Sequence, residues 1–370
     1  MYNVFANMKG RIIMLLYIKD RINDYNANFF LNELFEASKG LGALEAKIDN
    51  YQFDGILIPM LHKKEALSSM YIEGTQTTIN DAFESEVNPN VISTEESTEI
   101  SNHMKVLMYG AEHLRNGVFT HIFIKKLHEI LMTGLLDKSK QKSLGKYKMK
   151  DNKIVNSAGT TIYTPPSHTE TKRYMDELID FINEKNDGIN PLIKAAIMHA
   201  QFESIHPFED GNGRVGRILV SLYLYKAKII NFPFFYISEA ISQDKTVYYN
   251  KLSDTRQNSY DEWIKYFLKK IIIQTENHIT YINSLNELYI RTKATVQSCI
   301  NSPKFDLIVE NLFTHPVLSS SLLADLLNVS VGQAKRYLST LVEKQVLLKN
   351  DWKKNTIYFF GELLDLARRI

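Results

Sequence analysis

The feature that most constrains the fold is a polar loop placed between two apolar helical segments. The segment LIKAAIMHAQFESI (192–205) is strongly helical and apolar, and RILVSLYLYKAK (217–228) has the same character. Between them, HPFEDGNGRVGR (206–217) gathers a histidine, two carboxylates, an asparagine flanked by glycines and two arginines. A core segment would not collect so many polar groups, so the sequence predicts two buried helices joined by a loop that performs chemistry.

The backbone of this loop is suited to holding an anion. His206 precedes Pro207 and must end the first helix, because the residue before a proline disfavours the α region. Gly211, Asn212 and Gly213 tolerate positive φ, so successive N–H groups can converge on one point. That point lies at the N-terminus of the second helix, where unpaired N–H groups and the helix dipole favour negative charge.

The side chains of the loop add the chemistry of phosphate transfer. Arg214 and Arg217 lie three residues apart, and two guanidinium groups beside an anion site suit a polyphosphate. Asp210 is a hard oxygen ligand suited to Mg²⁺. His206 can accept a proton from an attacking hydroxyl at neutral pH, and Phe208 should point inward and fix the loop. The alternative is a structural loop whose arginines form surface ion pairs.

The loop resembles the pattern HPFxxGNGRxxR of the Fic-domain family, without gaps or substitutions. The similarity continues in LHEILMTG and GKY before the hairpin segment, YTPP after it, HAQFESI before the loop, and TVYYNKL and DEWIKYFL after it. It covers about residues 60–270. The resemblance implies a mainly α fold, with a helical core and a β-hairpin flap. It also implies transfer of AMP from ATP to a Ser, Thr or Tyr hydroxyl of a target protein, with auto-modification as a possibility.

The resemblance also implies a set of site residues. His206 would be the catalytic base and Asp210 would hold Mg²⁺, while the flap at 146–163 would dock the target segment as an extra strand. The implied ATP-binding residues are Gly211, Asn212, Gly213, Arg214, Gly216, Arg217 and Tyr249. Transfer of phosphate or phosphocholine is the alternative within the same family.

A second motif, SMYIEG (69–74), matches the inhibitory pattern of the same family. Glu73 would pair with Arg217 and take the place of the γ-phosphate, while Ser69 anchors the helix and Gly74 lets it end. The alternative is that Glu73 is a solvated carboxylate at a helix end. The motif predicts a self-inhibited enzyme.

The chain divides into four expected regions: an N-terminal helical region (1–110) with the inhibitory helix at about 62–75, a catalytic core (111–270), a helical connector (271–300) and a C-terminal domain (301–370). Within the first region, the apolar spacing of Ile22, Tyr25, Phe29, Phe30, Leu34 and Phe35 predicts a helix over 20–50. Pro59 predicts a helix end, with a new helix starting at Leu61. Two helices are expected over 95–135, with Ile122, Leu127, Ile130 and Leu131 on the apolar face of the second.

The C-terminal stretch 305–360 predicts a winged-helix domain of the α+β class. A helix ends near Pro316, Ser319 and Ser330 cap two further helices, and VLL and TIYFF flank the polar KNDWKKN as strands. Side chains that could contact DNA are Gln333, Lys335 and Arg336 in the second capped helix and Lys349, Lys353 and Lys354 in the wing. Protein contacts are the alternative for such a domain.

Composition limits the remaining possibilities. The net charge of +2 gives no global field for nucleic acid or anionic membrane, and the single cysteine, Cys299, excludes an internal disulfide framework. RIIMLLYI (11–18) is too short for a membrane span and is expected to be buried. A cytoplasmic enzyme is therefore expected, with a homodimer as one possibility. The competing class is a nucleotide-sensing regulator that acts through DNA or protein binding by the C-terminal domain.

Overall fold

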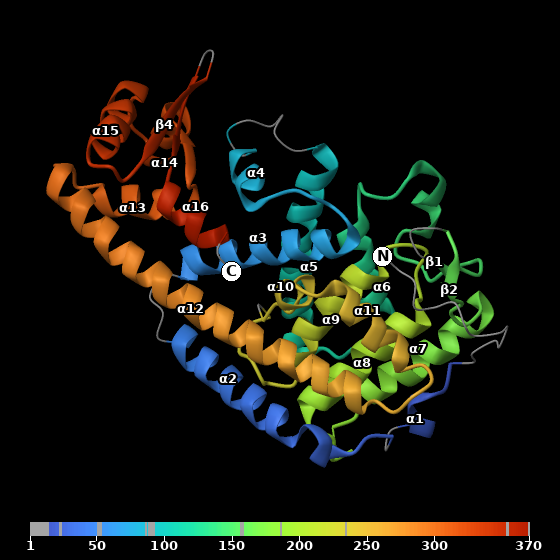
Figure 1. Cartoon of the computed structure of the whole chain (residues 1–370). Helices are drawn as coiled ribbons and strands as arrows, with labels where there is room; N and C mark the ends of the chain where they lie inside the picture. The colour runs from blue at the N-terminus through green and yellow to red at the C-terminus, as the bar shows by residue number, and fades with distance from the viewer. Residues whose placement is uncertain are drawn as a thin grey trace. The chain divides into compact units, whose positions relative to one another are not determined.

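The computed structural model describes residues 15–21, 24–49, 54–85, 87, 93–155, 159–185, 187–233, 235–352 and 355–368. The chain is mainly helical, as predicted, and forms two compact units (Figure 1). One unit comprises Met1–Gly42 and Ser101–Ile273, and the other comprises Ala43–Ile100 and Gln274–Ile370. The four-part division expected from the sequence groups the chain differently and stays a prediction. None of the helices in the described part of the chain is long and apolar enough to cross a membrane.

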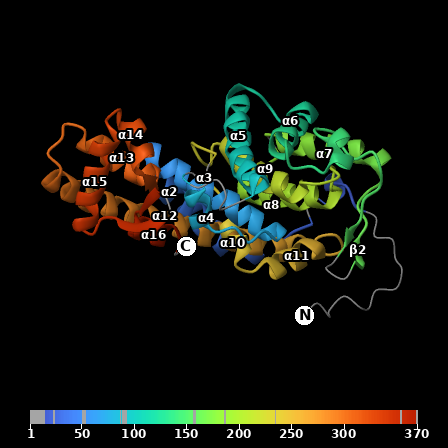
Figure 2. The same ribbon diagram turned by 90° about the horizontal axis from the view of Figure 1, so that it is seen from above.

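The centre of the first unit is the pair of apolar helices expected from the sequence. α8 (Pro191–Ile205) begins with Pro191 in its first turn and is capped by Asn190, whose side chain accepts the N–H of Leu192. It is buried along its whole length from Leu192 to Ile205. α8 packs against α9 (Asn212–Lys226) and against α7 (His168–Asn183), and Figures 1 and 2 show α8 and α9 side by side. The loop 206–217 therefore starts from a fully enclosed helix.

The other elements of the first unit are shorter. They are α1 (Ile18–Arg21), η1 (Ala27–Phe30), α6 (His121–Met132), η2 (Lys138–Ser143), α10 (Ser238–Ser242) and α11 (Lys245–Asp254). β1 (Ile154–Val155) and β2 (Thr161–Tyr163) pair antiparallel, which confirms a hairpin within 146–163. Its paired part is shorter than predicted, and residues 156–158 near its tip lie outside the described residues.

Three helices run from one unit into the other: α2 (Leu31–Asp49), α5 (Thr94–Asn116) and α12 (Asp261–Cys299). The prediction of one helix over 20–50 is wrong at its start, because the Asn26 side chain accepts the N–H of Asn28 and opens a new turn before α2. The expected apolar face is confirmed only in part, because Phe30 is buried but Phe29 is exposed. Ala37 and Leu41 are buried whereas Phe35 is 65% exposed, and Ile22 lies outside the described residues. In α6, Ile122 is likewise exposed rather than part of the apolar face.

In the second unit, α3 (Asp54–Glu73) passes through Pro59 without ending, which corrects the predicted break. Proline removes one helical hydrogen bond and is least costly near the N-terminus of a helix. Here Ile56 and Leu57 before it, and Met60 and Leu61 after it, are all buried. Packing on both sides of the proline outweighs the lost bond. α4 (Ile79–Glu84) follows, with a complete capping box between Thr78 and Asp81.

The C-terminal part contains the predicted helices with their predicted caps. α13 (Phe305–Thr314) ends before Pro316, Ser319 caps α14 (Ser320–Leu327), and Ser330 caps α15 (Val331–Glu343). β3 (Val317–Ser319), β4 (Leu348–Trp352) and β5 (Asn355–Phe359) form an antiparallel sheet in the order β3-β5-β4, followed by α16 (Gly361–Arg368).

Two details of this part differ from the sequence prediction. β3 was not expected, and the strands extend into the polar segment that was expected to link them. Lys353 and Lys354 lie outside the described residues. The assignment of this part to the winged-helix class stays a prediction.

Candidate active site

The loop begins with a strained histidine. α8 ends at Ile205, as predicted, and His206 adopts the left-handed conformation with φ 49° and ψ 60°. This conformation is uncommon for a residue with a side chain and is retained only where the surrounding structure enforces it. Such strain is typical of functional sites. It falls here on the residue expected to act as the base.

The loop is closed by Asn212. Its Oδ1 accepts the N–H of Phe208 at 2.8 Å, and its Nδ2 donates to the carbonyl of Phe208 at 2.9 Å. The Phe208 ring is fully buried and stacks on His128, with ring centroids 4.0 Å apart and planes 8° from parallel. The prediction that Phe208 points inward and fixes the loop is confirmed.

The start of α9 corrects one expectation about the backbone. Gly211 alone is left-handed, with φ 76°, whereas Asn212 and Gly213 already belong to the first turn of α9. A Cβ atom at Gly211 would lie 2.6 Å from Sδ of Met132, so the position needs glycine for space as well as for conformation. The backbone N–H groups available to an anion are therefore those of a helix N-terminus, not those of a run of left-handed residues.

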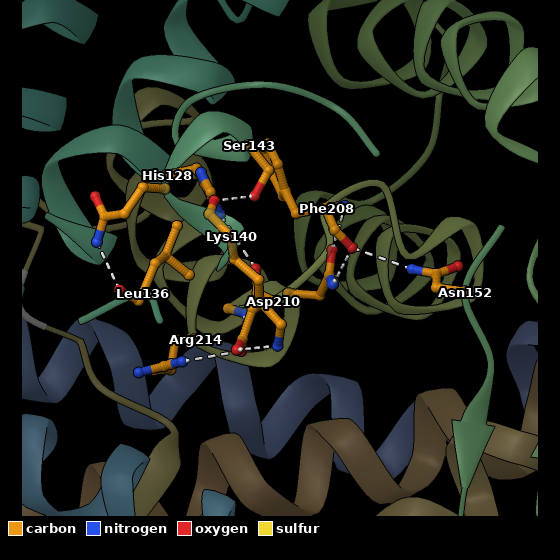
Figure 3. A network of polar contacts seen from close by, with 11 residues as sticks. His128, Leu136, Lys140, Ser143, Asn152, Phe208, Asp210 and Arg214 are labelled. Carbon is orange, nitrogen blue, oxygen red and sulfur yellow. Dashed lines mark hydrogen bonds and ion pairs between the residues drawn. The ribbon is translucent and has the colours of Figure 1, made fainter. Parts of the chain in front are cut away.

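Asp210 is the centre of a charged network (Figure 3). Its Oδ1 accepts the N–H of Gly211 at 2.7 Å and Nη2 of Arg214 at 3.3 Å, and its Oδ2 accepts Nζ of Lys140 at 3.3 Å. Burial favours the neutral acid. Arg214, the Gly211 N–H and Lys140 outweigh it, so the pKa of Asp210 lies below its usual value. Asp210 is therefore ionised at neutral pH.

This donor set fits Mg²⁺ brought by a nucleotide. Within the described ranges, no group of three or more His, Cys, Asp or Glu side chains could hold a metal. Mg²⁺ in phosphate-transfer sites is commonly bound by one or two carboxylates together with substrate phosphates and water. The single carboxylate of Asp210, placed beside a helix N-terminus, matches this arrangement.

His128 supports the loop from α6. Its Nδ1 accepts the N–H of Gly145 at 3.1 Å, so the ring proton is on Nε2, which donates to the carbonyl of Asp210 at 3.1 Å (Figure 3). Burial lowers the pKa of His128 to about 4, so the ring is neutral at physiological pH. Only the structure shows that this histidine lies against the loop.

The lysines of the flap region fall into two groups. Lys140 contacts Asp210, and Lys148 is buried with 3% of its surface exposed. The other lysines of this region are exposed: Lys138, Lys142, Lys146, Lys150 and Lys153. All seven lysines stand close together in the sequence, between Lys138 and Lys153. The segment has no helical or strand periodicity that could have singled out Lys140 and Lys148.

Two family models match the chain. The model of the Fic/DOC family matches residues 118–224, and that of the N-terminal region of the Fic/DOC family matches residues 31–112. The chain belongs to the Fic-domain family.

Curated relatives of this Fic chain are named protein adenylyltransferases. Over 228 residues the chain is 26% identical to a probable protein adenylyltransferase of Aquifex aeolicus, an alignment that covers 55% of this chain and 68% of the relative. It is 30% identical over 105 residues to a protein adenylyltransferase of Nematostella vectensis, covering 28% of this chain and 23% of the relative. A protein adenylyltransferase of Caenorhabditis elegans is 33% identical over 66 residues, which are 18% of this chain and 13% of that protein. The chain therefore spans only a small part of the two animal relatives.

Solved Fic structures share the fold. A Fic family protein of Desulfovibrio desulfuricans superposes with a TM-score of 0.58 at 19% identity, over 90% of this chain and 96% of that chain. A Fic-domain signalling protein of Bacteroides thetaiotaomicron gives a TM-score of 0.55 at 21% identity, over 67% of this chain and 97% of that chain. At these identities the likeness concerns the fold alone.

The remaining residues that the Fic pattern singles out lie in different settings. Gly216 faces α8, where a Cβ atom would overlap Oε1 of Glu203, so this glycine permits close packing of α8 and α9. Arg217 is buried, with 2% of its surface exposed. Tyr249 on α11 is 44% exposed, and its ring centroid lies 5.1 Å from that of Tyr248. Contact of these residues with ATP stays a prediction.

The inhibitory motif of the Fic pattern forms the end of α3. The N–H of Gly74 donates to the carbonyl of Tyr71, and the N–H of Thr75 donates to the carbonyl of Met70, both at 3.1 Å. With Gly74 at φ 112°, these bonds form a Schellman motif that ends the helix after Glu73. Gly74 therefore ends the helix as expected. Glu73 and Arg217 belong to different compact units, so their pairing stays a prediction.

Proposed function

We propose that this Fic protein is a self-inhibited protein adenylyltransferase, which transfers AMP from ATP to a Ser, Thr or Tyr hydroxyl of a target protein and of itself. The observation that carries the proposal is the loop 206–217. His206 is held in a strained conformation, and in the same loop Asp210 accepts a hydrogen bond from Arg214 in the first turns of α9. The family membership and the names of the curated relatives support the same activity.

The proposed reaction uses the loop residues as follows. His206 takes the proton from the attacking hydroxyl, whose oxygen forms a bond to the α-phosphorus of ATP. The bond from the α-phosphorus to the bridging oxygen breaks, and pyrophosphate leaves. The first turn of α9, with Arg214 and Arg217, binds the phosphates, and Tyr249 contacts the adenine. Mg²⁺ held by Asp210 supplies positive charge that balances the phosphates.

The proposed inhibition acts on nucleotide alignment. In this proposal Glu73 pairs with Arg217 and occupies the place of the γ-phosphate. ATP then still binds, but its α-phosphorus is misaligned, and a displacement of about 1 Å can cost about 10²-fold in rate. The end of α3 supports this role because its hydrogen bonds fix the backbone at Glu73, and Ser69, one turn earlier, is buried.

The test compares three forms of the chain with Mg²⁺ and ATP by intact-protein mass: the wild type, Glu73→Gly, and Glu73→Gly with His206→Ala. We expect an AMP-sized gain that is at least tenfold faster in Glu73→Gly than in the wild type and is absent when His206 is also replaced. A phosphate-sized gain would mean a different transfer reaction. If no form gains mass although each binds ATP, adenylylation of itself is excluded and the regulator class with its C-terminal domain is favoured.

A further inference from the structure

The end of α8 and the loop that follows it receive an unusual set of hydrogen bonds from the flap segment. Five consecutive carbonyl oxygens, from Ser204 to Phe208, each accept a donor from the segment between Lys148 and Tyr163. Carbonyls at a helix C-terminus lack partners inside the helix and are commonly satisfied by a cap or by water. Here donors from the flap root, by which we mean Lys148, Asn152 and Tyr163, take the place of a cap. His206 lies in the middle of the five carbonyls from Ser204 to Phe208.

Lys148 provides two of these donors. Its backbone N–H donates to the carbonyl of Pro207 at 2.8 Å, and its Nζ donates to the carbonyl of Ile205 at 3.3 Å. Nζ also donates to Oδ1 of Asn152 at 2.8 Å. The side chain is almost fully buried, and this burial lowers the pKa of Lys148 to about 8 even though Asp151 opposes the change. Burying an ammonium group is costly unless it is satisfied, so this one is retained for its contacts.

Asn152 completes the bonding around the histidine. Its Nδ2 donates to the carbonyl of Phe208 at 3.1 Å (Figure 3). The same Nδ2 donates to the carbonyl of His206 at 3.2 Å. Because Lys148 donates to Oδ1, the amide group can point only its nitrogen at the loop. The backbone of His206 is therefore held through Asn152, and Asn152 is oriented by Lys148.

The other strand of the flap is attached to the same helix end. The hydroxyl of Tyr163, the last residue of β2, donates to the carbonyl of Ser204 at 3.0 Å. The guanidinium of Arg256 lies over the Tyr163 ring at 3.7 Å, and its Nε donates to Oγ of Ser204 at 3.4 Å. Both sides of the hairpin are thus fixed where the catalytic loop begins.

We propose that Lys148 and Asn152 are positioning residues that hold His206 in its left-handed conformation and so join the flap to the catalytic base. The proposal rests on the proposed function, in which His206 is the base and the flap docks the target. A left-handed histidine before a proline persists only if its surroundings enforce it, and these bonds are the contacts that act directly on its carbonyl and those beside it. Movement of the flap would then move the base.

The kinetic test uses Lys148→Met and Asn152→Ala, each in the Glu73→Gly background, with the exposed Lys172→Met on α7 as the matched control. We expect kcat for AMP transfer to fall about 10- to 100-fold in the first two variants, because a base displaced by about 1 Å loses alignment. The Kd for ATP should stay within about twofold, since neither residue belongs to the phosphate site. In the double variant, kcat should be at most about threefold lower than in the slower single variant, because Lys148 acts on the His206 carbonyl through the Asn152 amide that it orients.

A spectroscopic test separates positioning from a general effect on folding. Chains with ¹⁵N-labelled histidine would be compared by NMR, with the His206 resonances assigned by their loss in His206→Ala. We expect the imidazole signals of His206 to shift in Lys148→Met and Asn152→Ala, and to stay unchanged in Lys172→Met. Lys148→Arg, which keeps a buried cationic donor, should recover at least part of the rate and of the original signals.

These experiments judge the two proposals separately. If the Glu73→Gly parent transfers no AMP, the proposed function fails, and the NMR comparison alone decides whether the flap root positions His206. If the parent is active, kcat within twofold of the parent in Asn152→Ala and in Lys148→Met overturns the inference, as do unchanged His206 signals in folded variants. Should Lys148→Met fail to fold, Asn152→Ala decides the question, because it leaves the lysine in place.

Discussion

At the scale of single residues, the site contains an unfavourable backbone conformation and a buried charge, each of which costs free energy. His206 occupies a conformation that most side chains avoid, and Lys148 is a cation with only 3% of its surface exposed. Both are accounted for by hydrogen bonds to carbonyls around the loop. The sequence identified His206 through its neighbours in the motif, whereas Lys148 was one of several lysines. Only tertiary packing distinguishes it from the exposed Lys146 and Lys150.

Buried histidines make the stability of the folded chain depend on pH. His199 on α8 illustrates the effect. Its Nε2 lies 2.9 Å from the hydroxyl of Tyr248; burial, followed by the charge of Arg217, lowers the pKa of His199 from 6.5 to about 3. Between those values the unfolded chain binds more protons than the folded chain. Stability is therefore lost as the pH falls, with a slope approaching about 1.4 kcal/mol per pH unit for one such histidine.

Urea unfolding at several pH values between 6.5 and 4 would measure this loss. His199→Gln should unfold with a visibly shallower pH dependence, while remaining less stable than the wild type at pH 7. Equal slopes in the two proteins would contradict the assignment of the effect to His199. Three further buried histidines contribute in the same direction, since burial also lowers their pKa: His62, His128 and His278.

At the scale of elements, the site depends on the close approach of α8 and α9. Gly216 lies on the face of α9 that meets Phe202 and Glu203 of α8. A Cβ atom there would overlap the Glu203 carboxylate and would lie 3.2 Å from the Phe202 ring. We expect Gly216→Ala to lower the free energy of unfolding by about 1–3 kcal/mol through overpacking, and to lower AMP transfer by displacing the start of α9.

The matched control for this change is Gly332→Ala on α15, where an added Cβ atom meets nothing within 4 Å. This substitution should be neutral or should stabilise the chain by up to about 1 kcal/mol, because alanine is the better helix former. Thermal unfolding of both variants would check the pair. A Gly216→Ala protein as stable as Gly332→Ala would show that the helices can separate without cost.

Local signals predicted helix ends better than helix faces. The caps at Ser319 and Ser330 were predicted from the sequence, because a serine bonded to backbone three residues ahead is a local interaction. The buried face of α2 was not predicted, because tertiary packing buries Ala37 and leaves the larger, apolar Phe35 exposed. The predicted helix end at Pro59 was wrong for a related reason. Burial of the residues on both sides of Pro59 outweighed the tendency of proline to end a helix.

At the scale of the whole molecule, α2, α5 and α12 pass from one compact unit into the other. Breaking α12 at this boundary would expose two new helix ends with unsatisfied backbone groups. We therefore expect one cooperative unfolding transition for both units. Leu285→Ala, at a fully buried position in the second-unit part of α12, should destabilise the chain by about 2–5 kcal/mol. The matched control is Ile290→Ala on the same helix, where the side chain is 60% exposed.

Tryptophan fluorescence can report on the first unit alone. In a Trp352→Phe background, Trp263, buried in the first unit, is the remaining tryptophan. If the units unfold together, Leu285→Ala should lower the midpoint seen by Trp263 by several degrees, and Ile290→Ala should leave it within about one degree. The opposite result is an unfolding midpoint at Trp263 that is unchanged by Leu285→Ala, together with an earlier transition detected by circular dichroism. It would show that the two units unfold independently.

The family, the mainly helical fold, the two apolar helices and the loop between them could all be predicted from the amino-acid sequence. These follow from local rules, since proline ends α8, glycine opens α9 and apolar residues bury both helices. The left-handed conformation of His206, the contact of Lys140 with Asp210, and the bonds of Lys148 and Asn152 to the loop became visible only in the folded chain. Such contacts join residues more than 50 positions apart through segments without periodic pattern, so no local rule in the sequence specifies them.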